Sequence, residues 1–502
     1  MGKIKNLQRL NIVFESLSII SVRKTALLGI TLFFIISLAI GLRTYGLSWD
    51  QGYDYTPHPD ERAILMKVAE ISLPSANNIQ EVIDADRSSL NPRWFAYGSL
   101  PIYLLKVAHF GYSAVLDVDL HDLRIIARSI SVLADIGTLI TVYFLGSRIY
   151  GHREGIIGAL LLALAVLHIQ LSHYYAVDTL QALFALCAIF FMYRLAREGR
   201  VMDSVLSGGF IGLGLATKFS QIPIYIPFLM AQLIYLIQSF RKSHDSGVSL
   251  GGQLKLALIR LLAGVGASAA VFVLAQPYAL LDWSTYAKDL AEQSEMVRRI
   301  RDYPYTRQYV DTPQYWYHIR QLATWGLGLP LGIVCWISVL WAAIKGLRFS
   351  AALIYIMIGL ALPALMLSLS TSLIVIIVAT IIATVALALT IPFRSSRSYM
   401  DLILLSWVIP YFLITGALEV KFLRYLIPIT PVMLLLSARM LVTLWESAGD
   451  RFSYLRPILA SLFILLLGST GAYSLGYMAV YSEPHTAVRT SEWILANVPS
   501  GS

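Results

Sequence analysis

Apolar segments long enough to cross a lipid bilayer recur along almost the whole 502-residue chain. A membrane-spanning helix needs about 20 predominantly apolar residues, and roughly thirteen segments meet this requirement. They lie at 25–43, 124–147, 154–173, 178–196, 203–218, 222–239, 256–280, 323–344, 349–369, 371–392, 401–418, 425–445 and 457–479. The pattern predicts an all-α polytopic membrane protein.

The segment 94–115 decides the predicted topology. It is apolar, but Pro101, Lys106 and His109 favour a helix that lies on the membrane surface. With that placement, the basic clusters between the spans share one side of the membrane. These clusters are Arg148/Arg153, Arg194/Arg197/Arg200, Arg241/Lys242/Lys255, Lys345/Arg348, Arg394/Arg397 and Arg451/Arg456. Because Lys and Arg are enriched in cytoplasmic loops, we expect a plasma-membrane protein with its N-terminus inside.

The same topology divides the chain into regions. Residues 1–24 are a basic cytoplasmic N-terminus that precedes an uncleaved signal anchor. The membrane domain covers 25–480 and has two long extracytoplasmic loops, at 44–123 and 281–322. Residues 481–502 lie outside as the start of an extracytoplasmic C-terminal region.

Composition excludes a water-soluble protein. Hydrophobic residues make up 57% of the chain and charged residues 14%, against about 45–50% and 25% in soluble domains. The net charge of +9 reflects the basic cytoplasmic loops, so we expect no nucleic-acid partner. The two cysteines, Cys187 and Cys335, lie in apolar runs and form no disulfide framework.

Candidate chemistry gathers on the predicted outer face. The candidates are His58, Asp60 and Glu61 of one loop motif, His173 and Asp178 of the segment HYYAVD, then Lys218, and Lys421 and Arg424 beside Glu419. Adjacent carboxylates suit general-base catalysis or the binding of a hard cation. Basic side chains can hold a phosphate or diphosphate at the bilayer surface.

Each candidate also has a structural alternative. Asp60 and Glu61 follow Pro59 and suit the first turn of a helix, and Asp178 suits a helix N-cap. Lys218 and Arg424 could reach the lipid headgroups from helix ends. The convergence of all these residues on one face favours a functional site.

Asp135 lies inside a predicted span, where an ionisable group is costly and suggests function. Arg128 lies two helical turns away on the same face, and we expect the two to form an ion pair. The second long loop is rich in tyrosine and arginine, with rings that could stack on sugars. Trp316 and Trp325 suit the ordinary aromatic belt of a membrane protein.

Six stretches, taken together, carry a family resemblance. They are TPHPDERA (56–63), NPRWFAYGSLPIYLL (91–105), RSISVLADIGTLITVYFLGSRIYG (128–151), LSHYYAVDTLQALF (171–184), GLATKFS (214–220) and KFLRYLIPITP (421–431). The chain resembles the integral-membrane glycosyltransferases of superfamily C (GT-C). Within this superfamily the chain most resembles glycosyltransferase family 39, with its protein O-mannosyltransferases and lipid A aminoarabinose transferases. The resemblance implies a GT-C helical bundle with amphipathic helices in the first outer loop.

The resemblance also implies roles for the candidates. Asp60 takes the central catalytic position, Glu61 is the other member of the acidic pair, and Asp178 assists. Lys218 and Arg424 contact the lipid phosphate. We predict His58, His173, Tyr97 and Lys421 as further substrate-binding residues. Which of Asp60 and Glu61 is the base stays open. The end of the chain resembles the lead-in to a soluble extracytoplasmic domain, which either is lacking or is cut short here.

The implied function is the inverting transfer of a monosaccharide, a mannose-like hexose or an aminosugar. The donor is a polyprenyl-phosphate sugar in the bilayer, and the acceptor is a hydroxyl of a protein, lipid or glycan. We expect no required cofactor, and a metal site built from His58, Asp60, Glu61, His173 and Asp178 has little support from the spacing. The alternatives are a polytopic transporter or lipid flippase, and an oligosaccharyltransferase-like enzyme with a diphosphate donor and a divalent metal.

Overall fold

The computed structural model describes residues 26–51, 56–73, 79–115, 120–243, 250–346, 396–451, 453–499 and 501. Within these ranges the chain forms helices and the loops between them, with no β-strand. The predicted all-α fold is therefore confirmed for the described part of the chain. The basic N-terminus, at 1–24, lies outside it.

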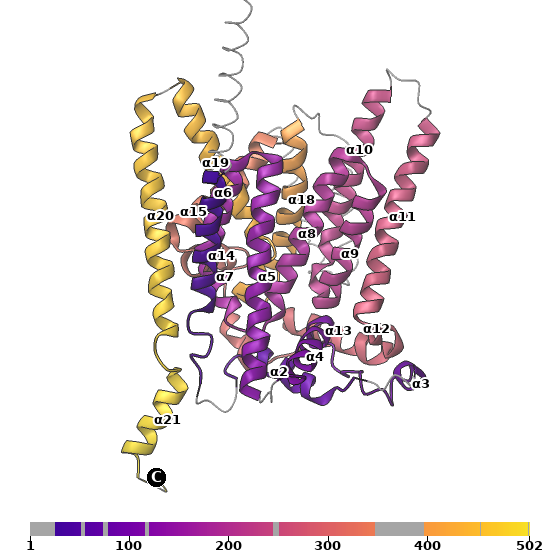
Figure 1. The fold of residues 1–502 in the computed structure, drawn as a ribbon, viewed down its shortest axis with the longest axis vertical. Helices are drawn as coiled ribbons and strands as arrows, with labels where there is room; N and C mark the ends of the chain where they lie inside the picture. The colour runs from indigo at the N-terminus through magenta and orange to yellow at the C-terminus, as the bar shows by residue number, and fades with distance from the viewer. Residues whose placement is uncertain are drawn as a thin grey trace, which may run out of the picture.

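A first helix, Ala26–Thr44, is followed by the elements that Figure 1 labels. The helices of the first long loop are α2 (Pro59–Glu70), α3 (Ile79–Ile83) and α4 (Leu100–Ser113). The central bundle contains α5 (Leu120–Ile149), α6 (His152–Ala163), α7 (Val166–Ser172), α8 (Val177–Glu198), α9 (Val201–Thr217), α10 (Tyr225–Ser243) and α11 (Leu250–Ala275). The second long loop contains α12 (Tyr278–Leu281), α13 (Trp283–Val297) and α14 (Trp316–Gln321). The chain continues through α15 (Leu329–Gly346), α18 (Ser396–Gly416), α19 (Thr430–Arg451), α20 (Arg456–Met478) and α21 (Thr486–Asn497).

The helices match the predicted spans closely. Eight of the described helices are long and apolar enough to cross a membrane, and α6 and α7, which are bent by 58° at their junction, meet the same criterion when they are taken together. Two shorter apolar helices, α9 and α15, follow the same pattern. Together they match every predicted segment except 349–369 and 371–392, which lie outside the described residues. The number thirteen therefore stays a prediction.

Burial separates core helices from lipid-facing ones. Trp407 of α18 is fully buried, as are most apolar residues of α8 and α19. On α11, in contrast, Leu254, Leu258 and Leu262 are 47%, 54% and 61% exposed. Apolar side chains repeated at four-residue intervals on an outer surface require an apolar solvent. The chain is a multi-pass membrane protein.

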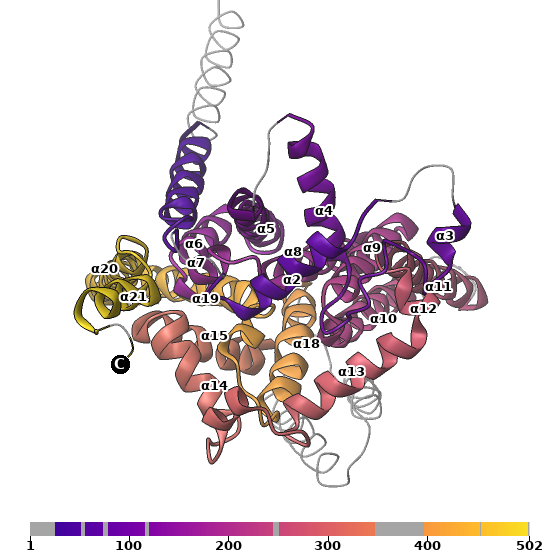
Figure 2. The ribbon, with the colours of Figure 1, turned by 90° about the horizontal axis from the view of Figure 1, so that it is seen from below.

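One end of the bundle is covered by the two long loops. Figures 1 and 2 show α2, α4, α12 and α13 lying across this end, whereas the long helices run through the bundle. Most of the segment 94–115 thus forms a helix across the bundle end, α4, as the charge pattern predicts. We call this the loop-covered end.

Three helices run from the loop-covered end to the opposite end. They are α5, α8 and α15, and each has a basic residue in its last turn. These residues are Arg148, Arg197 and Lys345. The predicted basic side of the protein is therefore the end opposite the long loops.

Candidate active site

Two ion pairs meet at the loop-covered end. The first joins Asp60 and Arg424, and the second joins Asp178 and Lys218, with 2.9 Å between Lys218 Nζ and Asp178 Oδ1. Tyr97 lies beside both pairs, because its hydroxyl is 3.5 Å from Arg424 Nη2 and its ring centroid is 5.8 Å from Lys218 Nζ. We call these five residues the ion-pair cluster.

Helix ends position the members of the cluster. Asp60 lies in the first turn of α2, where Pro59 begins the helix, so the predicted helix start is confirmed. Asp178 lies in the first turn of α8, but Ala176 is the N-cap and makes no side-chain cap bond. The structural alternative of Asp178 as the N-cap is therefore wrong, since its carboxylate extends to Lys218 at the end of α9.

A close backbone approach places Tyr97. The amide of Gly98 donates to the carbonyl of Thr217, at 3.0 Å, one residue before Lys218. A Cβ atom at position 98 would overlap the carbonyl of Ala216. Only glycine fits here, so Gly98 holds the loop against α9 and brings Tyr97 to Lys218.

The cluster is partly open. The side chains of Asp60, Arg424 and Lys218 are 17%, 16% and 13% exposed. Asp178 is buried, and its second oxygen has no hydrogen-bond partner within the described residues. Burial, together with the charge of Asp178, raises the pKa of Tyr97 well above its ordinary value, so its hydroxyl stays a neutral donor.

Glu61 has a different environment from its neighbour Asp60. Arg128 donates to both Glu61 oxygens, from Nε at 2.9 Å and from Nη2 at 2.8 Å. The amide of Tyr175 donates to the same carboxylate at 2.9 Å. Glu61 is fully buried. A carboxylate held by three donors away from solvent is fixed in place.

Asp50 completes this buried group. Arg128 donates to it from Nη1 at 2.8 Å and from Nη2 at 2.7 Å, and Arg124 Nη1 lies 3.2 Å away. Burial raises the pKa of Asp50, but the hydrogen bonds and charge of Arg128 outweigh it, so the pKa lies below its ordinary value. We call Asp50, Glu61, Arg124 and Arg128 the buried arginine core.

The predicted pair of Arg128 and Asp135 is wrong. Asp135 binds Arg43 of the first helix and His168 of α7, at 2.5 Å and 2.6 Å. Seven residues separate Arg128 from Asp135 by roughly 10 Å along the helix axis. A position on the same helical face is therefore not enough for Arg128 and Asp135 to form an ion pair. Each residue binds the groups that lie at its own depth in the bundle.

The two predicted histidines lie in different surroundings. The ring of His58 lies 4.7 Å from that of Tyr174, and its Nδ1 has no partner in the described structure. Burial and the charges of Arg424 and Arg128 lower the pKa of His58 to about 3, so it is neutral near pH 7. His173 instead contacts two backbone carbonyls, of Ile169 and Tyr45, and stacks on Tyr481. These contacts give His173 a structural role.

Lys421 bonds within its own loop. It is buried and donates to the carbonyl of Glu419 at 2.9 Å. In the described part of the chain it makes no hydrogen bond or ion pair with the ion-pair cluster. Its phosphate-binding role stays a prediction.

The second long loop ties the site segments together. Asp289 of α13 accepts from the amide of Phe95 at 2.6 Å, two residues before Tyr97. The carbonyl of Val297 accepts from the amides of Glu419 and Val420, both at 3.1 Å. The loop thus holds the segments that carry Tyr97 and Arg424. Trp316 and Trp325 are 59% and 65% exposed, as expected for a membrane belt.

Sequence reasoning missed some members of the site. Tyr425 has its ring 4.9 Å from Lys218 Nζ, and the partners of Arg128 were assigned wrongly. The charged Arg128 at the start of a span was the available signal, since such a group needs partners near the membrane surface. Among the described residues, no group of three or more His, Cys, Asp or Glu side chains could hold a metal ion.

Comparisons with known proteins agree with this architecture. Residues 120–275 match a family model described as dolichyl-phosphate-mannose-protein mannosyltransferase. No curated protein is significantly similar in sequence. The archaeal oligosaccharyltransferase AglB from Archaeoglobus fulgidus, in complex with an inhibitory peptide and a dolichol-phosphate, has a similar structure. Its TM-score is 0.53 at 14% identity, and the match covers 95% of this chain and 59% of AglB.

Two further structures are similar. The Archaeoglobus fulgidus oligosaccharyltransferase in complex with Zn and sulfate has a TM-score of 0.51 at 14% identity, covering 94% of this chain and 56% of that one. ArnT from Cupriavidus metallidurans bound to undecaprenyl phosphate has a TM-score of 0.48 at 14% identity, covering 90% and 76%. The chain spans less than two thirds of the length of the archaeal enzyme. It shares the fold of these membrane enzymes, in agreement with the GT-C helical bundle that the sequence resemblance implies.

Proposed function

We propose that the protein is a membrane glycosyltransferase that transfers a monosaccharide from a polyprenyl-phosphate donor to a hydroxyl acceptor. The ion-pair cluster carries this proposal. It combines a partly exposed carboxylate with two cations at one end of a membrane bundle. Such a site can bind a phosphate while a base acts beside it.

The donor class follows from the location and from the relatives. A polyprenyl tail stays in the bilayer, so its phosphate lies at the membrane surface, where Lys218 and Arg424 would meet it. AglB was solved with a dolichol-phosphate, and the family description names a dolichyl-phosphate sugar. We extend this donor chemistry to the present chain.

The proposed reaction is a single in-line displacement. The acceptor oxygen forms a bond with the anomeric carbon as the bond from that carbon to the phosphate oxygen breaks. Asp60 takes the proton of the acceptor hydroxyl, and the electron pair of the broken bond leaves with the phosphate. Attack opposite the leaving group inverts the anomeric configuration.

The surrounding residues suit this reaction. Lys218 and Arg424 would stabilise the negative charge that grows on the leaving phosphate. Tyr97, a neutral phenol, would donate to the same phosphate. Asp178 would keep Lys218 oriented through their ion pair, and neutral His58 would position the acceptor.

Glu61 is assigned a structural role in this proposal. Its carboxylate is occupied by Arg128 and Tyr175, whereas Asp60 is partly open. The sugar is a mannose-like hexose or an aminosugar, and the acceptor is a protein, lipid or glycan. The site faces the extracytoplasmic side, because the opposite end carries the basic residues.

A comparison of sugar donors tests the proposal. Purified protein in detergent is given radiolabelled sugar on polyprenyl phosphate, on polyprenyl diphosphate or on a nucleotide, with a mixture of hydroxyl acceptors. We expect product from the polyprenyl-phosphate sugar alone, with activity retained in chelator. Transfer from nucleotide sugars only would refute the donor class.

The alternatives give different results with the same purified protein, in detergent or reconstituted into proteoliposomes. A diphosphate donor with chelator-sensitive activity would indicate an oligosaccharyltransferase-like enzyme. Movement of labelled lipid across proteoliposomes without a covalent product would indicate a flippase. Either outcome would replace the proposed function.

A further inference from the structure

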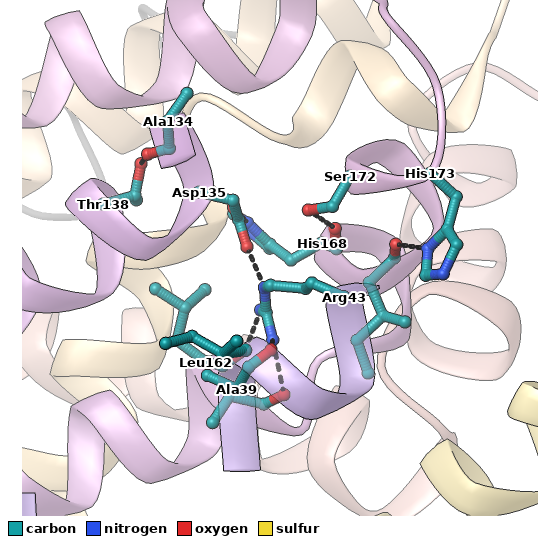
Figure 3. A network of polar contacts seen from close by, with 12 residues as sticks. Ala39, Arg43, Ala134, Asp135, Thr138, Leu162, His168, Ser172 and His173 are labelled. Carbon is teal, nitrogen blue, oxygen red and sulfur yellow. Dashed lines mark hydrogen bonds and ion pairs between the residues drawn. The ribbon is translucent and has the colours of Figure 1, made fainter. Parts of the chain in front are cut away.

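A buried charged network lies deeper in the bundle than the candidate active site. Arg43 of the first helix, Asp135 of α5 and His168 of α7 are all fully buried. Figure 3 shows the side chain of Asp135 next to those of both Arg43 and His168. Arg43 Nε donates to Asp135 at 2.5 Å, and His168 Nδ1 donates to the other Asp135 oxygen at 2.6 Å.

The network lies at the break between α6 and α7. The two helices meet at an angle of 58°, and α6 ends with carbonyls that lack helical partners. Arg43 donates to the carbonyl of Leu162 at 3.0 Å (Figure 3) and to that of Ala163 at 3.0 Å. A cation at a helix C-terminus is favourable. Arg43 thus adds a donor to each carbonyl at the break, and the carbonyl of Leu162 also accepts from the amide of Ala165 at 3.2 Å.

The short helix after the break leads directly into the site. Helix α7 has seven residues, which is roughly 10 Å of helix. Tyr174 and Tyr175 follow at once, the first against His58 and the second bonded to Glu61. Asp178 begins the next helix and binds Lys218. We call residues 173–178 the site turn.

We infer that Arg43, Asp135 and His168 act as positioning residues that set the site turn through the broken span. Arg43 fixes the end of α6, and Asp135 fixes α7 through His168. The direction of α7 then determines where Tyr174, Tyr175 and Asp178 lie. None of the three network residues contacts the ion-pair cluster in the described structure, so they act through the backbone. The effect on catalysis rests on the proposed function, but the effect on the site turn does not.

The opposite end of the bundle offers a matched control. Arg439 of α19 forms an ion pair with buried Asp401 of α18, and Tyr150 donates to the same carboxylate at 2.6 Å. This group also contains one arginine, one aspartate and one ring. It has no contact with α7 among the described residues. Arg439→Gln should therefore show the general effect of losing a buried arginine, without a change in the position of the site turn.

The first experiment measures the site turn without using activity. Tyr174→Cys is introduced into a chain with Cys187→Ala and Cys335→Ala, and its labelling by a membrane-impermeant maleimide is timed. We expect Arg43→Gln to change the labelling rate about tenfold, since the turn loses its fixed position. Arg439→Gln should stay within about twofold. His168→Phe keeps a ring but loses the bond to Asp135, and it should shift the rate in the same direction as Arg43→Gln.

The second experiment measures catalysis in the chain with native Tyr174. Arg43→Gln should lower kcat on the order of 100-fold with a smaller change in the KM for donor, as expected for misplaced groups. Arg43→Lys should recover part of the loss. Unchanged labelling in folded Arg43→Gln, or an equal change in Arg439→Gln, would overturn the inference. If Arg43→Gln does not fold, unchanged labelling in His168→Phe overturns it. If the labelling rate changes as expected but neither the unchanged chain nor any variant transfers sugar, only the proposed function is refuted.

Discussion

Two carboxylates that are neighbours in the sequence belong to different regions of the molecule. Asp60 joins the ion-pair cluster, where its side chain is 17% exposed and its partner Arg424 is 16% exposed. Glu61 joins the buried arginine core, where its side chain and that of Arg128 are fully buried. Successive residues in the first turn of a helix point in different directions, so one faces the site and the other the bundle.

The difference separates catalytic from structural charge. In the buried arginine core, two carboxylates accept nearly all the hydrogen bonds of Arg128, and little capacity is left for a ligand. In the ion-pair cluster, each cation is partly open, and one oxygen of Asp178 has no partner among the described residues. A charged group with remaining capacity can bind a substrate, whereas a saturated one holds the fold.

The largest expected effect is on Asp60. Asp60→Asn keeps the size of the side chain and can still accept from Arg424, but it removes the proposed base. We expect the transfer rate to fall about 10²- to 10⁴-fold, with little change in thermal stability. The measurement is kcat with a polyprenyl-phosphate sugar, together with the melting temperature.

Asp302 provides the control for Asp60. It pairs with Arg307 in the second long loop and is half exposed. Asp302→Asn should retain activity within about twofold, since an exposed pair contributes little. Full activity in Asp60→Asn would show that Asp60 of the ion-pair cluster is not the catalytic base.

Glu61 should show the opposite pattern. Glu61→Gln leaves Arg128 buried with too little negative charge, and breaking a buried pair costs about 3–5 kcal/mol. We expect a large fall in melting temperature and poor recovery of folded protein. Glu70→Gln on the same helix removes an exposed pair with Lys67 and should cost less than about 1 kcal/mol. A stable Glu61→Gln variant without activity would make Glu61 the base.

Gly98 tests whether the cluster depends on backbone fit. Gly98→Ala would push the loop from α9, because the new methyl group overlaps the carbonyl of Ala216. We expect a loss of about 1–3 kcal/mol and lower activity as Tyr97 moves away from Lys218. Gly111→Ala on α4 meets open space, so it should be neutral or slightly stabilising. Equal stability of the two variants would contradict the assigned close approach.

The sequence predicted the bundle better than it predicted the pairing of charges. Apolar length and the charge pattern located the described spans and placed α4 across the bundle end, because both follow from the bilayer. The motifs also named Asp60, Asp178, Lys218 and Arg424, which the structure brings together.

Partners of buried charges were out of reach of the same reasoning. Asp135 binds residues 92 and 33 positions away, and such contacts depend on how helices pack. A single sequence gives the helical face of a residue but not the neighbour that this face meets. The saturation of Glu61 likewise depends on Arg128, which lies 67 positions away.

The smallest expected effect concerns His58, which lies between the two regions. Burial and the charges of Arg424 and Arg128 lower its pKa to about 3, whereas an unfolded histidine titrates near 6.5. Below pH 6.5 the unfolded chain therefore binds a proton that the folded chain does not. As the pH decreases, the free energy of unfolding decreases by up to about 1.4 kcal/mol per pH unit. His58→Gln should flatten the decline in melting temperature between pH 7 and pH 5. His318, whose pKa is lowered to about 4, should give the same sign when changed to Gln. An unchanged slope in His58→Gln would show that neither burial nor the charges of Arg424 and Arg128 lower the pKa of this ring in the folded protein.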